Sequence, residues 1–332
     1  MTNQAQLDAS VIIVNYNGGS YLLDCVAALS DGKFSKEIII VDNASEDKSA
    51  QTCKSRFTNV TVIYSTTNLG FAGGINLGVA HAHGKCFIFL NPDTVPGPGC
   101  IDRLVEEVFK YGGVVGPVAT TAGESTPEYG MIIDRMGLPQ GLQEPSPPLY
   151  VPGFCIATSP ECFYAVGGLD QRYFLFYEDT EYCWQALRRG HEVRIAQSAT
   201  LVHVGGTSAS GGYRRHNRIE STSTRIVLGG RNSLTMFLAC APASKLPIVI
   251  FGALLRNCIF AIFLIMAGRP RTALALAKGL WWNIREVPAT LQRRHKFGVT
   301  AFTENLAWSR ISRRYFIFAH LFAGDKIRLV DE

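Results

Sequence analysis

The 332-residue sequence lacks the cysteine patterns that mark a disulfide framework or a structural zinc site. Its nine cysteines stand singly and form no Cys-x-x-Cys, which favours a reducing compartment. Residues 1–10 have neither a basic segment nor an apolar run, so no secretory signal is recognised and we expect a cytoplasmic protein. No internal repeat is visible and 47% of the residues are hydrophobic, which excludes fibrous and disordered proteins.

Charge is distributed unevenly along the chain. Residues 1–212 carry 13 Lys and Arg against 21 Asp and Glu, a net charge of −8, whereas residues 213–332 carry 19 against 6, a net charge of +13. The basic part also contains long apolar runs, which favours an anionic membrane surface over nucleic acid as its partner. We therefore expect two domains, 1–212 and 213–332, joined by the small residues of 208–212.

The first half alternates between strand and helix patterns. Short apolar runs predict strands over 11–14, 37–41, 60–64 and 86–90, and helices are predicted over 20–29, 45–56 and 73–83, with Ser45 as an N-cap. This alternation predicts a parallel α/β sheet, in which ligands bind outside the carboxyl ends of the strands. Gly-x-Gly-x-x-Gly is missing after the first strand, which disfavours a nicotinamide or flavin cofactor. The proline-rich stretch 117–150 loses the pattern and is interpreted as an insertion near the acceptor side.

Two carboxylates follow predicted strands. Asp93, in a proline-stiffened turn after 86–90, suits a hard cation such as Mg²⁺ or Mn²⁺, with a turn or helix-capping role as the alternative. Asp42 suits a ribose hydroxyl or a base N–H, with an Asx turn as the alternative. The segment 68–76 opens a helix with three glycines, so its backbone N–H groups can approach an anionic group closely, unless the glycines serve only the loop geometry.

Glu178 and Asp179 lie among aromatic residues at the start of a predicted helix. Partial burial there can hold a carboxylate at the pKa that a general base needs, and helix capping by Asp179 is a compatible alternative. His203 follows a strand-like run and is a candidate ligand of a metal or a phosphate, although a lone histidine is more often structural.

Six segments in this order resemble inverting family 2 glycosyltransferases with the GT-A fold, in particular the bacterial rhamnosyltransferase-like members. The resemblance covers residues 10 to about 210. The matching segments are Val14-Asn15-Tyr16-Asn17, Val41-Asp42-Asn43-Ala44-Ser45, residues 68–76, Leu90-Asn91-Pro92-Asp93-Thr94, Gly167-Gly168-Leu169-Asp170 with Tyr177-Glu178-Asp179, and Val202-His203-Val204-Gly205-Gly206-Thr207-Ser208. It implies a Rossmann-like GT-A sheet of the nucleotide-diphospho-sugar transferase type, followed by a C-terminal amphipathic helical region.

The resemblance also implies roles for individual residues. Asn15, Asn17 and Asp42 would contact the base and ribose of a sugar nucleotide, and Asn68 and Asn76 would line the same pocket. Asp93 stands where the family's Asp-x-Asp motif supplies a metal ligand, Asn91 replaces the first acid of that motif, and His203 would assist. Asp179 matches the catalytic base, with Glu178 beside it. Gln185 and Glu181 depart from the family pattern, at positions where relatives commonly carry Arg and Asp, so acceptor contacts are the least defined.

The implied reaction is an inverting hexosyl transfer. A divalent cation, Mg²⁺ or Mn²⁺, would neutralise the leaving nucleoside diphosphate while Asp179 deprotonates an acceptor hydroxyl. The implied donor is a dTDP- or UDP-sugar, with rhamnose favoured, and the implied acceptor is a lipid-linked glycan of cell-surface polysaccharide or cell-wall synthesis. A membrane-bound polysaccharide synthase is the first alternative, but Gln-x-x-Arg-Trp and several clear spans are missing. A non-catalytic nucleotide-sugar-binding scaffold is the second.

The stretch 246–267 is long enough to span a membrane, but Arg256 and Asn257 lie at its centre. A central Arg costs about 2.5–3.5 kcal/mol on insertion scales, so we expect an in-plane or hairpin helix rather than a span. Trp281, Trp282 and the basic cluster 293–296 would add interfacial anchors. The expected location is therefore peripheral, on the inner face of the cell membrane, with an ordinary helical lobe as the alternative.

Overall fold

A computed structural model describes residues 7–204, 214–215, 218–295, 300–314, 316 and 326–329. Its contacts divide the chain into two units. The first unit comprises residues 1–131, 141–186 and 190–208, and the second comprises 132–140, 187–189 and 209–332. Two short segments of the acidic part of the sequence thus group with the second unit, while the predicted linker 208–212 lies outside the described residues.

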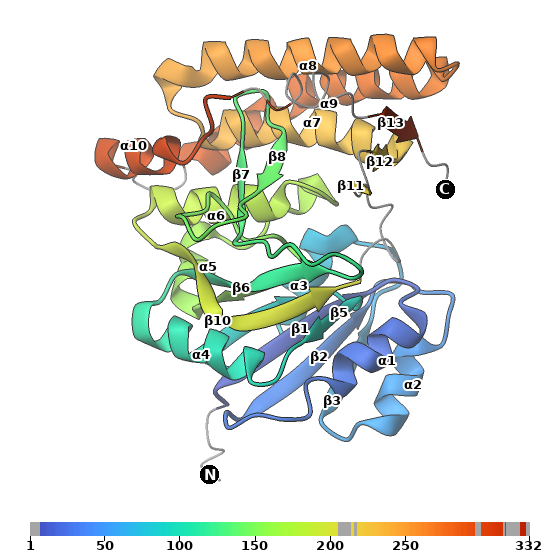
Figure 1. Ribbon diagram of the computed structural model, residues 1–332, viewed down its shortest axis with the longest axis vertical. Helices are drawn as coiled ribbons and strands as arrows, with labels where there is room; N and C mark the ends of the chain where they lie inside the picture. Colours follow the sequence, from blue (N-terminus) through green and yellow to red (C-terminus); the bar gives the residue numbers. More distant parts are fainter. Residues whose placement is uncertain are drawn as a thin grey trace. The chain divides into compact units, whose positions relative to one another are not determined.

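The first unit is built on an eight-stranded sheet of order β3-β2-β1-β4-β9-β6-β10-β5 (Figure 1). The first four strands run parallel, while β9 runs antiparallel to β4 and β6 and β5 runs antiparallel to β10. The strands are β1 (Ala9–Asn15), β2 (Lys36–Asp42), β3 (Val60–Tyr64), β4 (Cys86–Leu90), β5 (Thr94–Pro96), β6 (Val114–Thr121), β9 (Cys155–Thr158) and β10 (Val193–His203). The predicted parallel α/β arrangement of the first four strands is confirmed.

Helices pack against both faces of this sheet (Figure 1). Because side chains alternate along a strand, Val11 and Ile13 of β1 join the core under α1, α2 and α4, while Ile12 points to the other face. On that face, a Cβ at Gly78 of α3 would lie 2.3 Å from Cγ2 of Ile12, so the helix backbone rests directly on the sheet. The helices are α1 (Gly19–Ala27), α2 (Ser49–Arg56), α3 (Gly70–Val79), α4 (Cys100–Tyr111), α5 (Pro160–Val166), the 3₁₀ turn η1 (Gln171–Tyr173) and α6 (Glu178–Arg188).

Three local predictions were wrong. Ser45 caps no helix, because α2 begins only at Ser49 and the Ser45 hydroxyl instead accepts the N–H groups of Asn15 Nδ2 and of the Asn17 backbone. Helix α3 begins at Gly70 rather than at 73 and ends at Val79. The stretch 117–150 is not patternless, since β7 (Met131–Ile133) and β8 (Pro139–Gly141) form a two-stranded sheet within it.

The second unit is mainly helical. Its helices are α7 (Ser223–Cys240), the 3₁₀ turn η2 (Ala243–Lys245), α8 (Leu246–Met266), α9 (Pro270–His295) and α10 (Ala301–Ser309), and β11 (Arg214–Arg215), β12 (Arg218–Ser221) and β13 (Lys326–Leu329) form a three-stranded sheet. Helix α7 is the most buried of them, and α8 and α9 pack against it.

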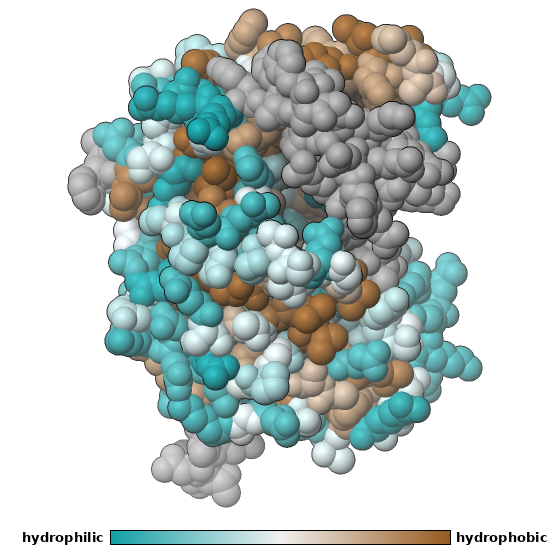
Figure 2. All heavy atoms as spheres, in the orientation of Figure 1, coloured by the Kyte–Doolittle hydropathy of each residue, from teal (hydrophilic) through white to brown (hydrophobic). Residues whose placement is uncertain are grey.

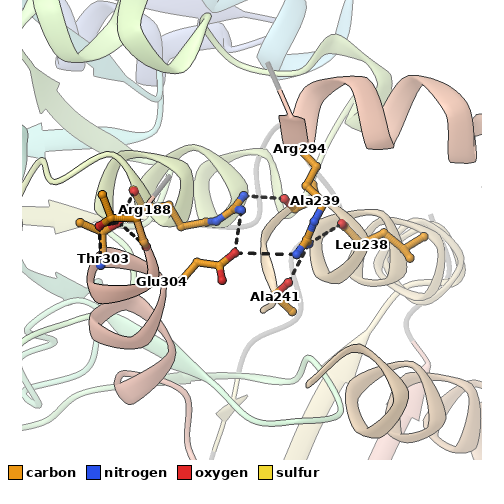
Figure 3. Close-up of polar contacts among 8 residues, drawn as sticks. Arg188, Leu238, Ala239, Ala241, Arg294, Thr303 and Glu304 are labelled. Atoms are coloured by element: carbon orange, nitrogen blue, oxygen red, sulfur yellow. Dashed lines mark hydrogen bonds and ion pairs between the residues drawn. The ribbon is translucent and has the colours of Figure 1, made fainter. Parts of the chain in front are cut away.

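Two buried arginines close the carboxyl end of α7 (Figure 3). Arg188 donates to the carbonyl of Ala239 at 2.8 Å and to Glu304 at 3.0 Å. Arg294 donates to the carbonyls of Leu238 at 3.0 Å and Ala241 at 2.7 Å. Positive charge at a helix C-terminus complements the helix dipole, so these contacts stabilise the end of α7. Arg294 is therefore not an interfacial anchor, and that part of the prediction for 293–296 was wrong; the side chains of His295 and Lys296 lie outside the described residues.

Candidate functional site

Asn15 organises the carboxyl end of β1. Its Nδ2 donates to Asp42 at 3.0 Å and to the hydroxyls of Ser45 and Ser49, and its Oδ1 accepts the N–H of Gly18. The side chain is fully buried. Asn15 thus orients Asp42, and the register pairs the two residues directly across β1 and β2.

Asn17 and Asp42 line the same edge of the sheet. Asn17 is exposed with φ 53°, and its Oδ1 accepts the backbone N–H of Glu46 at 2.8 Å. Asp42 is 7% exposed and ends β2 beside Asn15. The structure therefore brings these three predicted donor-site residues together, with only Asn17 well exposed to solvent. Their contact with a nucleotide stays a prediction.

Asn43 links the glycine-containing segment 68–76 to the edge of the sheet where β1 and β2 end. Nδ2 of Asn43 donates to Oδ1 of Asn68 at 2.9 Å, and its Oδ1 accepts the N–H of Leu69 at 2.8 Å. Gly70 has φ 71° and its N–H donates to Asn68. Asn43, which lies within the motif 41–45 but was given no role from the sequence, fixes the turn that opens α3, and the Asn68 side chain is exposed beside that turn.

Asn76 lies further along α3 and contacts a different segment. Its Nδ2 donates to the carbonyl of Leu169 at 2.7 Å, and its Oδ1 accepts the N–H of Leu169 at 3.1 Å. Both hydrogen-bonding ends of the amide therefore bind main chain. The structure places Asn76 beneath the segment that follows α5.

Asp93 and His203 face each other across the β5–β10 pair. The pairing of Thr94 with His203 brings His203 Nε2 to 3.4 Å from Asp93 Oδ1, and the ring of Phe154 stacks on the imidazole with centroids 4.8 Å apart. Asp93 is 4% exposed. The rest of the predicted His203 segment, 205–208, lies outside the described residues.

The donor set of Asp93 and His203 suits a cation that draws most of its ligands from a substrate. Among the described residues, no group of three or more His, Cys, Asp or Glu side chains is arranged to hold a metal. Mg²⁺ usually keeps several waters and is bound through one or two carboxylates plus substrate phosphates. A carboxylate oxygen and an imidazole nitrogen that approach from neighbouring strands fit that mode.

Asp179 is held by two main-chain donors. Its Oδ2 accepts the N–H of Gly153 at 2.8 Å, and its Oδ1 accepts the N–H of Thr180 at 2.6 Å. Burial raises the pKa of Asp179, and these hydrogen bonds oppose the rise. Helix α6 begins at Glu178, so Asp179 lies within its first turn and is not its N-cap.

Glu178 has a different environment. It is 4% exposed, and its Oε2 is buried with no hydrogen-bond partner among the described residues. Burial, together with the charge of Asp179, raises the pKa of Glu178 well above its usual range. Neighbouring carboxyl groups whose environments push their pKa values apart are typical of acid–base sites. The role of Asp179 as the base stays a prediction.

Two further residues of the first unit carried no signal in the sequence. Glu128 follows β6, and burial raises its pKa to about 7, opposed by the charge of His203. Tyr150 is buried, and its hydroxyl donates to Sδ of Met131 at 3.2 Å. Burial, with the charges of Asp179 and Glu128, raises the pKa of Tyr150 well above its usual range. Both residues lie in the stretch 117–150, which was interpreted only as an insertion.

A second candidate surface lies on α8. Within the described residues, the stretch Ala243–Met266 is long and apolar enough to cross a membrane by length and composition. Hydrophobic side chains gather over α8 in Figure 2. The exposed ones on this helix are Ile248, Phe251, Leu254, Leu255, Ile262, Ile265 and Met266. Helix α8 is therefore apolar on its outer face, while its buried face combines apolar residues with the polar pair Arg256 and Asn257.

The polar centre of α8 points into the second unit. Arg256 is 1% exposed and donates to the carbonyl of Met136 at 2.8 Å and to the hydroxyl of Ser233 at 2.6 Å. Asn257 donates to the carbonyl of Gly230 at 3.3 Å. The exposed apolar face thus carries no charge from Arg256.

Helix α9 carries a stripe of exposed apolar residues and a stripe of exposed basic residues. Its exposed apolar residues are Leu274, Trp281, Ile284 and Leu291, and its exposed basic residues are Arg271, Lys278 and Arg285. Three helical residues turn through about 300°, so the basic stripe lies about 60° from Leu274 and Trp281. Trp282 stacks instead on the guanidinium of Arg231, 4.4 Å from the ring centroid.

The sequence and the fold resemble those of known proteins. Residues 10–158 match the family model described as Glycosyl transferase family 2. The chain is 26% identical over 259 residues to an N-acetylglucosaminyl-diphospho-decaprenol L-rhamnosyltransferase of Mycobacterium tuberculosis, covering 67% of this chain and 84% of the relative.

Two solved structures share the fold. The S. aureus TarS 1–349 structure in complex with UDP-GlcNAc aligns with a TM-score of 0.56 at 14% identity, over 93% of each chain. The mannosyltransferase PcManGT of Pyrobaculum calidifontis, in complex with GDP-Man and Mn²⁺, aligns with a TM-score of 0.52 at 14% identity, over 96% of this chain and 86% of that one.

Proposed function

Since the chain is a family 2 glycosyltransferase, with its family domain over residues 10–158, we propose that it moves a sugar from a nucleotide donor to a lipid-linked acceptor with Asp179 as the base. The observation that carries this proposal is the environment of Asp179. The carboxylate is held by Gly153 and Thr180, and Glu178 beside it is buried with a raised pKa. One carboxylate stays available to accept a proton while its neighbour stays protonated.

The proposed reaction is a single displacement that inverts the anomeric carbon. Asp179 accepts the proton of the acceptor hydroxyl as its oxygen bonds to the anomeric carbon, and the bond from that carbon to the donor diphosphate breaks. The nucleoside diphosphate leaves with the electron pair. Because both Asp179 oxygens accept main-chain N–H groups, the carboxylate enters the reaction already oriented.

Asp93 and His203 would hold a divalent cation, Mg²⁺ or Mn²⁺, against the donor diphosphate. When bound, the ion would offset the charge that develops on the leaving group. The Mn²⁺ in the related mannosyltransferase structure supports this assignment by analogy of fold. Asp42, Asn17 and Asn68 line the neighbouring edge and would contact the nucleoside.

We infer a dTDP- or UDP-sugar donor with rhamnose favoured, and an acceptor carrying N-acetylglucosamine on a polyprenyl diphosphate. The support is the relative whose name gives L-rhamnose as the transferred sugar and N-acetylglucosaminyl-diphospho-decaprenol as the acceptor. Such an acceptor places the reaction at a membrane surface, in cell-surface polysaccharide synthesis.

We also infer that the second unit lies on an anionic membrane through the outer face of α8. That face is apolar over 21 residues, about 30 Å at 1.5 Å per residue, with the exposed Lys245 at its start and Arg271 beyond its end. The apolar stripe of α9 adds hydrophobic burial and its basic stripe adds electrostatic attraction to anionic lipid. These two attractions hold a helix in the plane of an anionic interface. The expected location is therefore peripheral, on the cytoplasmic face.

The test is a transfer assay with purified protein, Mn²⁺, polyprenyl-diphospho-N-acetylglucosamine and either dTDP-rhamnose or UDP-sugars. We expect a disaccharide product from wild type and about 10²–10⁴-fold less from Asp179→Asn. The anomeric configuration of the product, measured by NMR, tests inversion. Donor binding without any transfer or donor hydrolysis would favour the scaffold alternative and overturn the proposal.

A further inference from the structure

The segment 167–177, which leads into α6, has a backbone that needs support from outside itself. The φ angles of Phe174, Phe176 and Tyr177 are 64°, 70° and 71°. Such angles cost a residue other than glycine about 1–3 kcal/mol, and they persist only where the surrounding structure enforces them. Because Asp179 follows directly, whatever holds this segment also sets the position of the carboxylate.

Helix α3 holds the segment at its beginning through Asn76. The amide of Asn76 binds both the N–H and the carbonyl of Leu169, at 3.1 and 2.7 Å. A Cβ at Gly168 would lie 2.9 Å from Oδ1 of Asn76, so the approach depends on the glycine. This paired contact is the side-chain equivalent of a β-bridge.

Helix α3 holds the same segment again at its first turn. The N–H of Phe71 donates to the carbonyl of Phe174 at 2.8 Å, and a Cβ at Gly70 would lie 2.2 Å from that carbonyl oxygen. The Phe71 ring also lies against Gly153, whose Cβ would be 3.3 Å from Cε1. Gly153 is one of the two residues that donate to Asp179, so α3 contacts both the segment that leads into α6 and one donor to this carboxylate.

We infer that α3 is the positioning element for the catalytic base, and that Asn76 is a positioning residue that acts on proton transfer rather than on donor binding. The inference rests on the proposed role of Asp179. It departs from the donor-pocket role that the sequence resemblance implies for Asn76, because both ends of the amide bind Leu169. The same helix begins beside Asn68, so the nucleotide side and the base share one rigid support.

The experiment compares Asn76→Ala and Asn76→Asp with Ser10→Ala. Ser10 is also fully buried, and its hydroxyl donates to Glu37 and accepts the N–H of Gly84, but it lies near the amino end of β1, away from the site. We expect kcat to fall about 10- to 100-fold in both Asn76 variants and to stay near wild type in Ser10→Ala. Affinity for UDP and dTDP with Mn²⁺, measured by calorimetry, should stay within about threefold.

The pH profile gives a second readout that a purely structural role would not move. The hydrogen bond from Gly153 lowers the pKa of Asp179, so loosening the support should move the acid limb of kcat to higher pH. Adding Asn76→Ala to Asp179→Asn should cause no further loss, since Asn76 acts through Asp179. If Asn76→Ala does not fold, Gly168→Ala disturbs the same contact from the other side and should give the same shift.

Two results would overturn the inference. One is a loss of nucleoside diphosphate affinity in Asn76→Ala with kcat intact, which would return Asn76 to the donor pocket. The other is behaviour identical to that of Ser10→Ala. The Asp179→Asn variant separates this failure from that of the proposed function. If Asp179→Asn is active, Asp179 is not the base and the proposed function fails. If Asp179→Asn is inactive and Asn76→Ala behaves like wild type, only the positioning role of Asn76 fails.

Discussion

The N–H of Gly153 donates to Oδ2 of Asp179 at 2.8 Å, across 26 positions of sequence. With Thr180 on the other oxygen, both sides of the carboxylate face a main-chain donor. An Asn side chain offers only one such acceptor. Asp179→Asn therefore leaves one buried N–H facing an NH₂ group, a cost of about 1–3 kcal/mol, but it also removes a buried charge.

The Asp179 substitution predicts a specific kinetic pattern. We expect turnover to fall about 10²–10⁴-fold, with nucleoside diphosphate affinity nearly unchanged, because the basicity is needed only in the proton-transfer step. In wild type, burial raises the pKa of Asp179, so activity should fall as pH decreases through that raised value, when the carboxylate gains its proton. Steady-state rates across pH, with affinity measured separately, check this.

Glu178→Gln is the matched control. Glu178 already favours its protonated form, so an isosteric neutral side chain should change turnover much less than Asp179→Asn does. A larger loss in Glu178→Gln would move the base to Glu178.

Strand and motif patterns predicted the frame of the site. Strands β1, β2, β3 and β4 end within one residue of the apolar runs, and Asp42 pairs with Asn15 as the parallel sheet requires. Those patterns are local. The contacts of Asn76 with Leu169 span 93 positions, and no local periodicity encodes them.

Burial was the other feature that local patterns did not reveal. Glu128 lies in a proline-rich stretch whose composition indicates exposed loop, yet tertiary packing buries its carboxyl group. Arg294 belongs to a basic run that predicts interfacial anchors, yet it closes the end of α7. Long-range packing decides both cases, and a single sequence does not show it.

The metal assignment predicts that Asp93→Ala abolishes the Mn²⁺-dependent part of nucleoside diphosphate binding and leaves the fold intact. His203→Ala should weaken it less, because a neutral imidazole adds no charge to offset that of the cation. Calorimetric titration of UDP and dTDP with and without Mn²⁺ measures this. Equal Mn²⁺-dependent affinity in wild type and Asp93→Ala would exclude Asp93 as the main ligand.

Glu128 predicts a pH-dependent stability effect. Its pKa is about 7 in the folded protein, above the value of about 4.3 in an unfolded chain, so the folded state binds the proton more tightly. The contribution of Glu128 to the free energy of unfolding is therefore fully present below about pH 4.3, and it is lost as the pH rises through about 7. Glu128→Gln should raise the melting temperature relative to wild type at pH 7.5 and change it little at pH 4.5. An equal difference at both pH values would contradict the raised pKa.

The outer face of α8 predicts that membrane binding depends on its exposed apolar side chains. Phe251 is 68% exposed and Ile262 is 59% exposed, so neither side chain is buried within the second unit. A combined Phe251→Glu and Ile262→Glu variant should abolish sedimentation with anionic liposomes, because it places two charges in the buried half of the interface. Tyr164→Glu is the control, since Tyr164 is 61% exposed but belongs to the first unit.

The basic stripe of α9 predicts the salt dependence of the same binding. Each Lys or Arg near an anionic surface contributes about 1 kcal/mol, so Arg271→Gln with Lys278→Gln should weaken liposome binding about 30-fold at low salt. The loss should shrink as salt rises, because these exposed charges are screened beyond about 8 Å at physiological ionic strength. The Phe251 and Ile262 variant should instead stay impaired as salt rises, because salt screens the repulsion of its two added carboxylates but does not remove the cost of placing them in the apolar part of the interface. Liposomes without anionic lipid separate the two contributions, and unchanged sedimentation in both variants would show that α8 and α9 do not face the membrane.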